Sequence, residues 1–248
     1  MIGVLVLQDA DVPAGDQWLQ PEERTTLQSL RVPKRRADWR RGRWAAKQAV
    51  AGALGVSVSD VVVQAAADGV PEALVGGDLA PLTISISHSA DRAACLVLLP
   101  AMPAGCDLEQ VESRAPVFTD DWFTDAERRI VARAPRGDHD LVVTVVWSAK
   151  ESALKALRSG LRRDTRSVEV TESGPERDGW FQLKVHDVAT GDTLPGWWTR
   201  AGDLVLTVIT AHPSPPPTAL AVKPLTIGTH TRDQRPWESD RKLPHSDG

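Results

Sequence analysis

Cysteine is scarce in this chain and long apolar runs are missing, which excludes several classes of protein. Cys95 and Cys106 are too few for a disulfide framework and lack the paired spacing of a zinc site. No window approaches the roughly 18 to 20 uninterrupted apolar residues of a membrane span. The opening residues also lack the basic flank and the long apolar run of a signal peptide. We therefore expect a cytoplasmic protein without membrane contact.

The overall composition is that of an ordinary globular protein. The 248 residues are 42% hydrophobic and 25% charged, with a net charge of −4, which suits one large domain or two modest ones. Positive charge is concentrated in residues 31–47, where eight lysines or arginines accompany one acid, Asp38. Such a patch in a mildly acidic protein favours a local anion site over a surface for nucleic acid.

Two segments of the chain resemble each other at an offset of 103 residues. WAAKQAVAGAL (44–54) and WSAKESALKAL (147–157) agree at five of eleven positions. The apolar spacing predicts helices over 39–54 and 140–158, the first beginning near Asp38 and ending before Gly55, the second stopping at Gly160. About three strand-like runs follow each helix. A chance match between two amphipathic helices is the alternative to a duplication.

The repeated order predicts an α+β fold. We expect two similar α/β subdomains related by a pseudo-twofold axis, with the active site in the cleft between them. Residues 1–104 would form the N-terminal subdomain, which binds nucleotide phosphates, and residues 105–212 the C-terminal subdomain, which carries metal and catalytic residues. Residues 213–248 are rich in proline and polar residues, so we expect a flexible tail there.

Two acids alternate in the segment GCDLEQ (105–110). On an extended strand Asp107 and Glu109 project to one face, and hard carboxylate oxygens of this kind suit Mg²⁺. Acids also alternate on many exposed strands, so the pattern alone is weak.

The second helix adds an acid and a base at a spacing of four. Glu151 and Lys155 lie on one helix face, where the first copy of the repeat has Gln48 and Gly52. An exposed ion pair worth about 0.3–0.5 kcal/mol is the simpler interpretation. If the halves are symmetric, however, Glu151 joins the two strand carboxylates and Lys155 faces the same space.

A histidine flanked by serines ends a strand-like run at residues 87–89. A hydrolase triad is excluded as an interpretation, because its members must converge from separate parts of a fold. His88 beside a basic region is suited to hydrogen-bonding a phosphate, while a structural histidine is the alternative.

Taken together, these segments resemble the Sfp-type 4'-phosphopantetheinyl transferases over about residues 20 to 210. The resemblance is carried, in order, by PKRRADWRRGRWAAKQAV, ISISHS, GCDLEQ, FTDAERRIV and WSAKESALKALRSGL. It implies transfer of the phosphopantetheine arm of coenzyme A to a serine of an acyl or peptidyl carrier protein, with release of 3',5'-ADP. Whether the carrier serves fatty-acid, polyketide or nonribosomal peptide synthesis stays open.

The resemblance also implies roles for individual residues. Asp107, Glu109 and Glu151 correspond to the Mg²⁺ ligands, with Glu151 also the base for the serine hydroxyl, and Lys155 to the lysine on the pyrophosphate. Arg35, Arg43 and His88 correspond to residues that hold the nucleotide phosphates, and Lys47 and Lys150 are weaker candidates for that role. Val70 stands where the family commonly has a phosphate-contacting lysine.

The expected partners are therefore coenzyme A and a carrier protein whose acidic surface meets basic residues here. We expect a monomer, since an internal duplication lets one chain supply the interface between the halves. Two other functions fit parts of the sequence: a module that binds a nucleotide or nucleic acid through residues 31–47, and a Mg²⁺-dependent phosphohydrolase that uses the same carboxylates.

Overall fold

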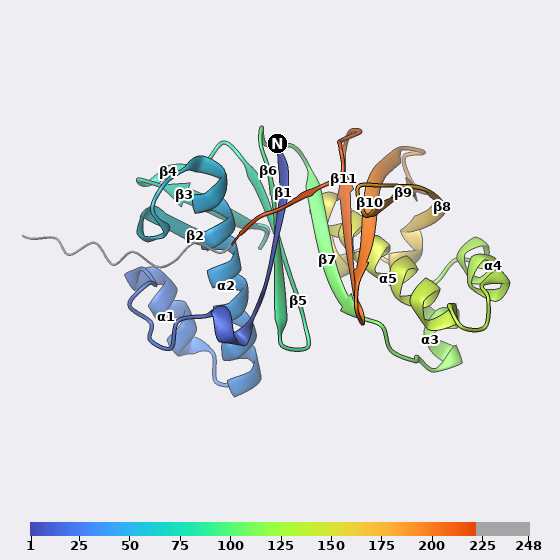
Figure 1. Cartoon of the computed structure of the whole chain (residues 1–248), viewed down its shortest axis with the longest axis horizontal. Helices are drawn as coiled ribbons and strands as arrows, with labels where there is room; N and C mark the ends of the chain where they lie inside the picture. Colours follow the sequence, from blue (N-terminus) through green and yellow to red (C-terminus); the bar gives the residue numbers. More distant parts are fainter. Residues whose placement is uncertain (222–248) are drawn as a thin grey trace, which may run out of the picture.

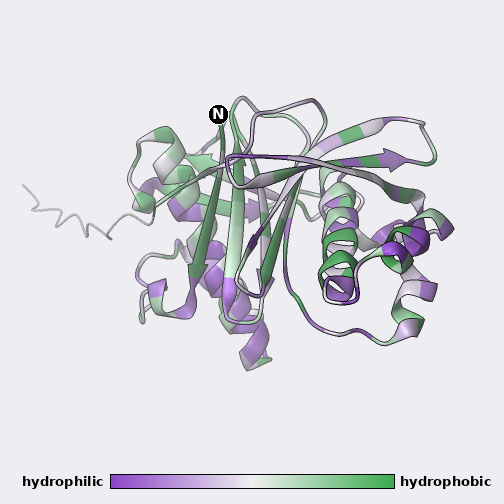
Figure 2. Cartoon of the chain, turned by 45° about the vertical axis from the view of Figure 1, so that its right-hand side comes forward, coloured by the Kyte–Doolittle hydropathy of each residue, from purple (hydrophilic) through white to green (hydrophobic). Residues whose placement is uncertain are grey.

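Two β-sheets pack against each other between two long helices (Figure 1). The computed structural model describes residues 1–221, apart from the side chains of Leu161 and Glu172. Figure 2 shows hydrophobic residues concentrated on the central strands. Within the described residues, no helix is both long enough and apolar enough to cross a membrane.

The first half of the chain builds one sheet, a small second sheet and two helices. The larger sheet has the strand order β12-β1-β6-β5 and the smaller one β2-β3-β4. The elements are β1 (Ile2–Gln8), α1 (Pro21–Ser29), α2 (Pro33–Leu54), β2 (Val61–Ala65), β3 (Pro71–Val75), β4 (Asp78–Leu79), β5 (Thr83–Ser89) and β6 (Arg92–Leu98).

The second half builds a five-stranded antiparallel sheet of order β7-β11-β10-β9-β8 and three helices. The elements are β7 (Ala104–Gln110), α3 (Pro116–Trp122), α4 (Asp125–Arg133), α5 (His139–Ala156), β8 (Val168–Arg177), β9 (Trp180–Asp187), β10 (Thr193–Ala201) and β11 (Leu204–Thr210). The mixed α+β class predicted from the sequence is confirmed.

Helix α2 begins earlier than its apolar spacing predicts. Pro33 occupies its first turn, where a missing N–H costs nothing and the fixed φ suits the helix. Asp38 is therefore inside the helix and pairs with Lys34 and Arg41, so the predicted start of the helix near Asp38 is wrong. Helix α4 begins with a capping box formed by Thr124 and Glu127.

Three apolar layers hold these elements together. Helix α2 buries Trp44, Ala45 and Val50 against the first sheet, and α5 buries its own apolar face against the second. Between the sheets lies a third layer, which includes Val4 and Leu206. Each half thus has its own core, and the layer between the sheets joins them.

A glycine allows α5 to lie unusually close to β7. A Cβ atom at Gly105 would lie 2.1 Å from the carbonyl oxygen of Ser152, which no side chain can do without displacing backbone. This contact brings the helix that carries Glu151 and Lys155 against the strand that carries Asp107.

A buried lysine–glutamate pair joins helix α2 to helix α1 and to strand β2 of the small sheet in the first half. Lys47 Nζ donates to Glu23 Oε2 and to the carbonyl oxygen of Val61. The backbone N–H groups of Gln20 and Val63 donate to the two carboxylate oxygens of Glu23.

The second half repeats this set of hydrogen bonds. Lys150 Nζ donates to Glu127 Oε2 at 2.6 Å and to the carbonyl oxygen of Val168 at 2.7 Å. The N–H groups of Thr124 and Val170 donate to the same carboxylate. The repeat is therefore present in the hydrogen bonding as well as in the sequence, while a twofold axis between the halves stays a prediction.

The segment after β11 corrects the predicted tail at residues 213–221. It crosses from the second half to the first (Figure 1), where β12 (Thr218–Ala219) pairs in parallel with β1. The side chain of Leu220 packs against the first core and over Gly3. Pairing with β1 and the packing of Leu220 thus order this segment despite its proline-rich composition. The rest of the predicted tail, 222–248, lies outside the described residues.

Candidate functional site

Strand β7 and helix α5 bring an acid and a base into direct contact. Lys155 Nζ donates to Asp107 Oδ1 at 2.7 Å and to the carbonyl oxygen of Cys106 at 3.0 Å. Asp107 is 4% exposed and also accepts a hydrogen bond from Ser87 Oγ on β5 at 2.7 Å. Both halves of the chain therefore contribute to the surroundings of Asp107.

Glu109, two residues along β7, is held by two donors from the second half. Trp147 Nε1 donates to Oε1 at 3.0 Å, and Arg114 Nη2 donates to Oε2 at 3.1 Å. Burial raises the pKa of Glu109, and the charge of Asp107 raises it further, against the opposing effect of Arg114.

Asp107, Glu109, Glu151 and Lys155 form one cluster, and Glu151 on α5 has its most perturbed carboxyl pKa. That pKa is raised to about 7, chiefly by burial; the charge of Lys155 opposes this effect, and the charges of Asp107 and Glu109 add to it. A carboxylate with this pKa can accept a proton near neutral pH and release it again, which is what a general base requires.

Lys155 keeps its charge in this setting. Burial alone would lower the pKa of Lys155, but Asp107, Cys106 and Glu151 together outweigh burial and leave that pKa above its ordinary value. The cluster thus combines three acids with one permanent cation.

Two oxygen atoms of the cluster have no protein partner. Asp107 Oδ2 and Glu151 Oε1 are buried and accept no hydrogen bond within residues 1–221, although buried polar atoms are normally paired. In the part of the chain that the structure describes, no group of three or more His, Cys, Asp or Glu side chains is arranged to hold a metal ion. The donor set nevertheless fits Mg²⁺ chemically, since that ion takes a few carboxylates and completes its shell with water and phosphate.

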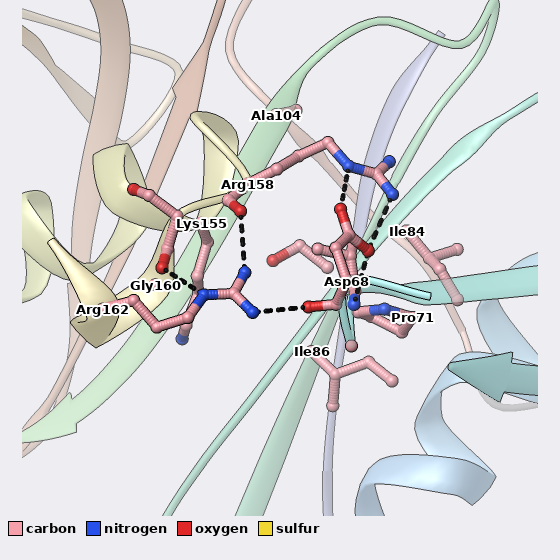
Figure 3. Close-up of a pocket in the computed structure, with 13 residues that line it drawn as sticks. Asp68, Pro71, Ile84, Ile86, Ala104, Lys155, Arg158, Gly160 and Arg162 are labelled. Carbon is pink, nitrogen blue, oxygen red and sulfur yellow. Dashed lines mark hydrogen bonds and ion pairs between the residues drawn. The ribbon is translucent and has the colours of Figure 1, made fainter. Parts of the chain in front are cut away.

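A cavity of about 530 Å³ lies beside this cluster, between the two halves (Figure 3). The first half supplies the β2–β3 turn at residues 68–71 and part of β5. The second half supplies the end of α5 and the residues after it, from Lys155 to Arg162. Lys155 belongs to both the cavity and the cluster, so a bound molecule would meet the acids at this residue. The volume is in the range of small-molecule sites.

A second cavity, of about 620 Å³, borders the apolar layer between the sheets. Val4, Leu108, Trp180 and Leu206 line it. Its described wall is mostly aliphatic and contains none of the predicted catalytic residues. The smaller cavity is therefore the candidate for chemistry.

The residues predicted to bind phosphate are only partly brought together. Arg43 and His88 line one small cavity of about 150 Å³. Arg43 stacks over Trp39, with its guanidinium 4.5 Å from the ring centre, and donates to the carbonyl oxygen of Val63. Arg35 is exposed near the start of α2 and lines none of these cavities.

Lys47 and Lys150 do not fit the predicted phosphate-binding role. Both are 0% exposed, and their ammonium groups are enclosed by Glu23 and Glu127. Burial lowers the pKa of each lysine, and the paired glutamate opposes that effect. A ligand phosphate cannot reach a fully enclosed ammonium group, so we correct this prediction and assign both lysines to the packing of the helices.

The basic residues of the segment 31–47 mostly hydrogen-bond within the protein. Arg36, Arg40 and Arg41 donate to backbone carbonyls of neighbouring segments. Within residues 1–221, Arg31 and Arg35 are the cations of this segment without a described ion pair or hydrogen bond. The number of basic residues in this segment is therefore larger than the number of cations that it offers to a ligand.

Sequence reasoning missed several residues around the cluster. The sequence draws attention to Ser87 only as a neighbour of His88, not as a donor to Asp107, and no motif marks Arg114. The partners of Glu109 cannot be read from spacing, because Arg114 and Trp147 lie five and 38 residues away along the chain.

The comparison with known families agrees with the location of the cluster. A family model described as the 4'-phosphopantetheinyl transferase superfamily matches residues 103–204. The match covers β7 and α5, hence every acid of the cluster and Lys155. No curated protein matches the chain. The narrower Sfp-type assignment stays a prediction.

Proposed function

We propose that this protein transfers the 4'-phosphopantetheine arm of coenzyme A to a serine of an acyl or peptidyl carrier protein, in a Mg²⁺-dependent reaction that releases 3',5'-ADP. The observation that carries the proposal is the arrangement of Asp107, Glu109, Glu151 and Lys155 beside a cavity of about 530 Å³. These residues lie within the part of the chain that matches the superfamily.

Glu151 accepts the proton of the carrier's serine hydroxyl. The serine oxygen forms a bond to the phosphorus atom of the phosphopantetheine arm, and the bond from that phosphorus to the bridging oxygen of 3',5'-ADP breaks. A base whose pKa lies near the working pH is the most efficient for such a step. Phosphoryl transfer otherwise depends on positioning and on stabilising negative charge.

The charges of the leaving group are met by cations from both halves. Asp107, Glu109 and Glu151 would hold Mg²⁺, which supplies positive charge to the pyrophosphate oxygens when bound. Lys155, which remains protonated beside Asp107, contacts the departing phosphate. Arg43 and His88 bind a further phosphate of the nucleotide, and Arg35 is a candidate at the exposed edge.

The carrier approaches the open side of the cavity. Carrier proteins with an acidic surface would favour the basic residues here through electrostatic complementarity. We expect a monomer, because both walls of the cavity come from one chain. The expected location is the cytoplasm.

Release of 3',5'-ADP tests the proposal against a phosphohydrolase that uses the same carboxylates. With coenzyme A and Mg²⁺ present, chromatography should detect 3',5'-ADP only after an apo carrier protein is added. Equal release without a carrier would favour the phosphohydrolase.

Nucleic-acid binding through residues 31–47 is the other alternative. A salt titration would distinguish it from the transferase. Binding to phosphate backbones weakens steeply as salt rises. Tight, salt-dependent binding of generic RNA or DNA without any binding of coenzyme A would favour that alternative. The internal hydrogen bonds of Arg36, Arg40 and Arg41 speak against it.

A further inference from the structure

The end of helix α5 departs from the pattern of the first half. Helix α2 is followed by Gly55, whose φ of 72° is in the left-handed region that glycine adopts freely. At the offset of the repeat, the equivalent position is Arg158, two residues after the end of α5, with a φ of 54°. A side chain is unfavourable in this conformation, and such strained residues cluster at functional sites.

The side chain of Arg158 reaches across the cavity to the first half of the chain (Figure 3). Its Nε donates to Asp68 Oδ2 at 2.8 Å and its Nη2 to Asp68 Oδ1 at 3.1 Å. Asp68 lies in the turn between β2 and β3, and Glu72 on β3 is 3.7 Å from Nη2. Two parallel hydrogen bonds of this kind are also how arginine binds a phosphate.

Arg162 adds a positive charge that no acid of residues 1–221 neutralises. Its guanidinium donates to three backbone carbonyl oxygens, those of Asp68 at 3.0 Å, Arg158 at 3.2 Å and Ser159 at 3.3 Å. Carbonyl groups position a guanidinium but leave its charge in place. Figure 3 shows this guanidinium between the end of α5 and the Asp68 turn.

The described lining of the cavity contains three cations, Lys155, Arg158 and Arg162, and one acid, Asp68. Asp107 pairs with Lys155 and Glu72 lies near Arg158 from outside this lining, so Arg162 is the lining cation without an ion pair among residues 1–221. Val70, which stands where the resembling family commonly has a phosphate-contacting lysine, lines the same cavity. The arginines after α5 supply positive charge on the opposite wall.

We propose that Arg158 and Arg162 bind a phosphate group of the nucleotide co-substrate, and that Asp68 is an internal competitor which pairs with Arg158 until that phosphate displaces it. This inference rests on the proposed function for the identity of the ligand. It assigns the phosphate contact to the residues that follow α5.

The test is the affinity for 3',5'-ADP, measured by calorimetry at fixed ionic strength. Arg158→Gly should raise the Kd about tenfold, because it removes the phosphate contact, while glycine suits the backbone conformation. Asp68→Asn should lower the Kd about threefold, because it frees Arg158 from its carboxylate partner. The two substitutions thus shift affinity in opposite directions.

The double variant separates this mechanism from a general charge effect. With Arg158→Gly already present, Asp68→Asn should no longer improve binding, since its benefit acts through Arg158. If Asp68→Asn improves binding equally in both backgrounds, the effect is long-range charge and the inference is wrong. It is also wrong if Asp68→Asn weakens binding, which would make the pair a structural link between the halves.

Controls come from an exposed pair on the β8–β9 hairpin. Arg177 and Asp178 lie 3.7 Å apart, and Asp178 has the same φ of 54° as Arg158. Arg177→Gln and Asp178→Asn should leave the Kd unchanged. If the unaltered protein does not bind 3',5'-ADP at all, the proposed function fails and this inference with it. If it binds and the variants behave otherwise than stated, this inference alone fails.

Discussion

Glu151 combines a buried oxygen that has no hydrogen-bond partner among residues 1–221 with a pKa raised to about 7. Burial without full pairing is costly to stability, so this position is better explained by a bound ligand or proton than by the fold. The neighbouring carboxylates have more partners, because Asp107 Oδ1 accepts hydrogen bonds from Ser87 and Lys155 and both oxygens of Glu109 accept hydrogen bonds.

The first prediction concerns the proton. Glu151→Gln should lower the rate of transfer at least a hundredfold, in the range of a lost general base, and leave the free energy of unfolding within about 1 kcal/mol of the original value. Rate assays and urea unfolding would measure the two effects. Glu176→Gln, a change at an exposed glutamate on β8, is the matched control. Parallel loss of activity and stability would make Glu151 structural.

The second prediction concerns pH and has a defined sign. A carboxyl group whose pKa is raised from 4.5 to about 7 by folding binds its proton more tightly in the folded state. The unaltered protein should therefore lose stability as pH rises from about 5 to about 7, while Glu151→Gln loses less. Because the group is partly solvated, we expect a difference of about 1–2 kcal/mol in unfolding free energy. A difference that stays constant over this range would contradict the raised pKa.

Residue spacing in the sequence indicated which residues could form the cluster. It did not indicate that Lys47 and Lys150 are buried against glutamates. Glu151 and Lys155 stood out because the first copy of the repeat has uncharged residues there. Lys47 and Lys150 are shared by both copies, and the structure shows that this sharing reflects packing. Their partners Glu23 and Glu127 lie 24 and 23 residues away, too far for a local pattern to reveal.

At the scale of the elements, two buried lysine–glutamate pairs hold the long helices in place. One joins α2 to α1 and β2, and the other joins α5 to α4 and β8. Lys150→Met should lower the free energy of unfolding by about 3–5 kcal/mol, since it leaves Glu127 buried without a counter-charge. Thermal or urea unfolding would measure the loss. Lys34→Met, at an exposed pair with Asp38, should cost less than about 1 kcal/mol. A Lys150 variant of full stability but weakened coenzyme A binding would restore the phosphate-binding role.

The close approach of α5 to β7 gives a further prediction. Gly105→Ala places a Cβ 2.1 Å from Ser152 O, so it should destabilise the protein by about 1–3 kcal/mol and reduce transfer by shifting Glu151 from Asp107. Gly52→Ala is the matched control, because a Cβ there has no neighbour within 4 Å and alanine favours the helix. Unfolding and activity measurements that find Gly105→Ala as mild as Gly52→Ala would contradict the account.

Elements with regular apolar spacing could be predicted from the sequence, and interrupted or polar ones could not. Helix α1 buries Glu23 and Leu27 and little else, so it has almost no apolar period. Strand β10 contains Pro195 and Gly196, residues that normally argue against a central strand. Gly196 is required there because a Cβ would lie 2.4 Å from the backbone carbonyl oxygen of Val208.

For the whole molecule, the two halves make different contributions to one site. The second half supplies the acids and Lys155 and matches the superfamily, while the first half supplies Ser87 and the opposite wall of the cavity. The sequence predicted a site between the halves from their repeat. It did not predict the return of residues 213–221 to β1, because a two-residue strand gives almost no pattern.

Transfer to a carrier protein is the central claim, and the mass of the carrier tests it most directly. Apo carriers from fatty-acid, polyketide and nonribosomal peptide synthesis would be incubated with the protein, coenzyme A and Mg²⁺, then measured intact by mass spectrometry. The account predicts that at least one carrier gains one phosphopantetheine arm on its acceptor serine, and that a carrier with alanine at that position gains none. If no carrier of the panel gains this mass, the account is contradicted.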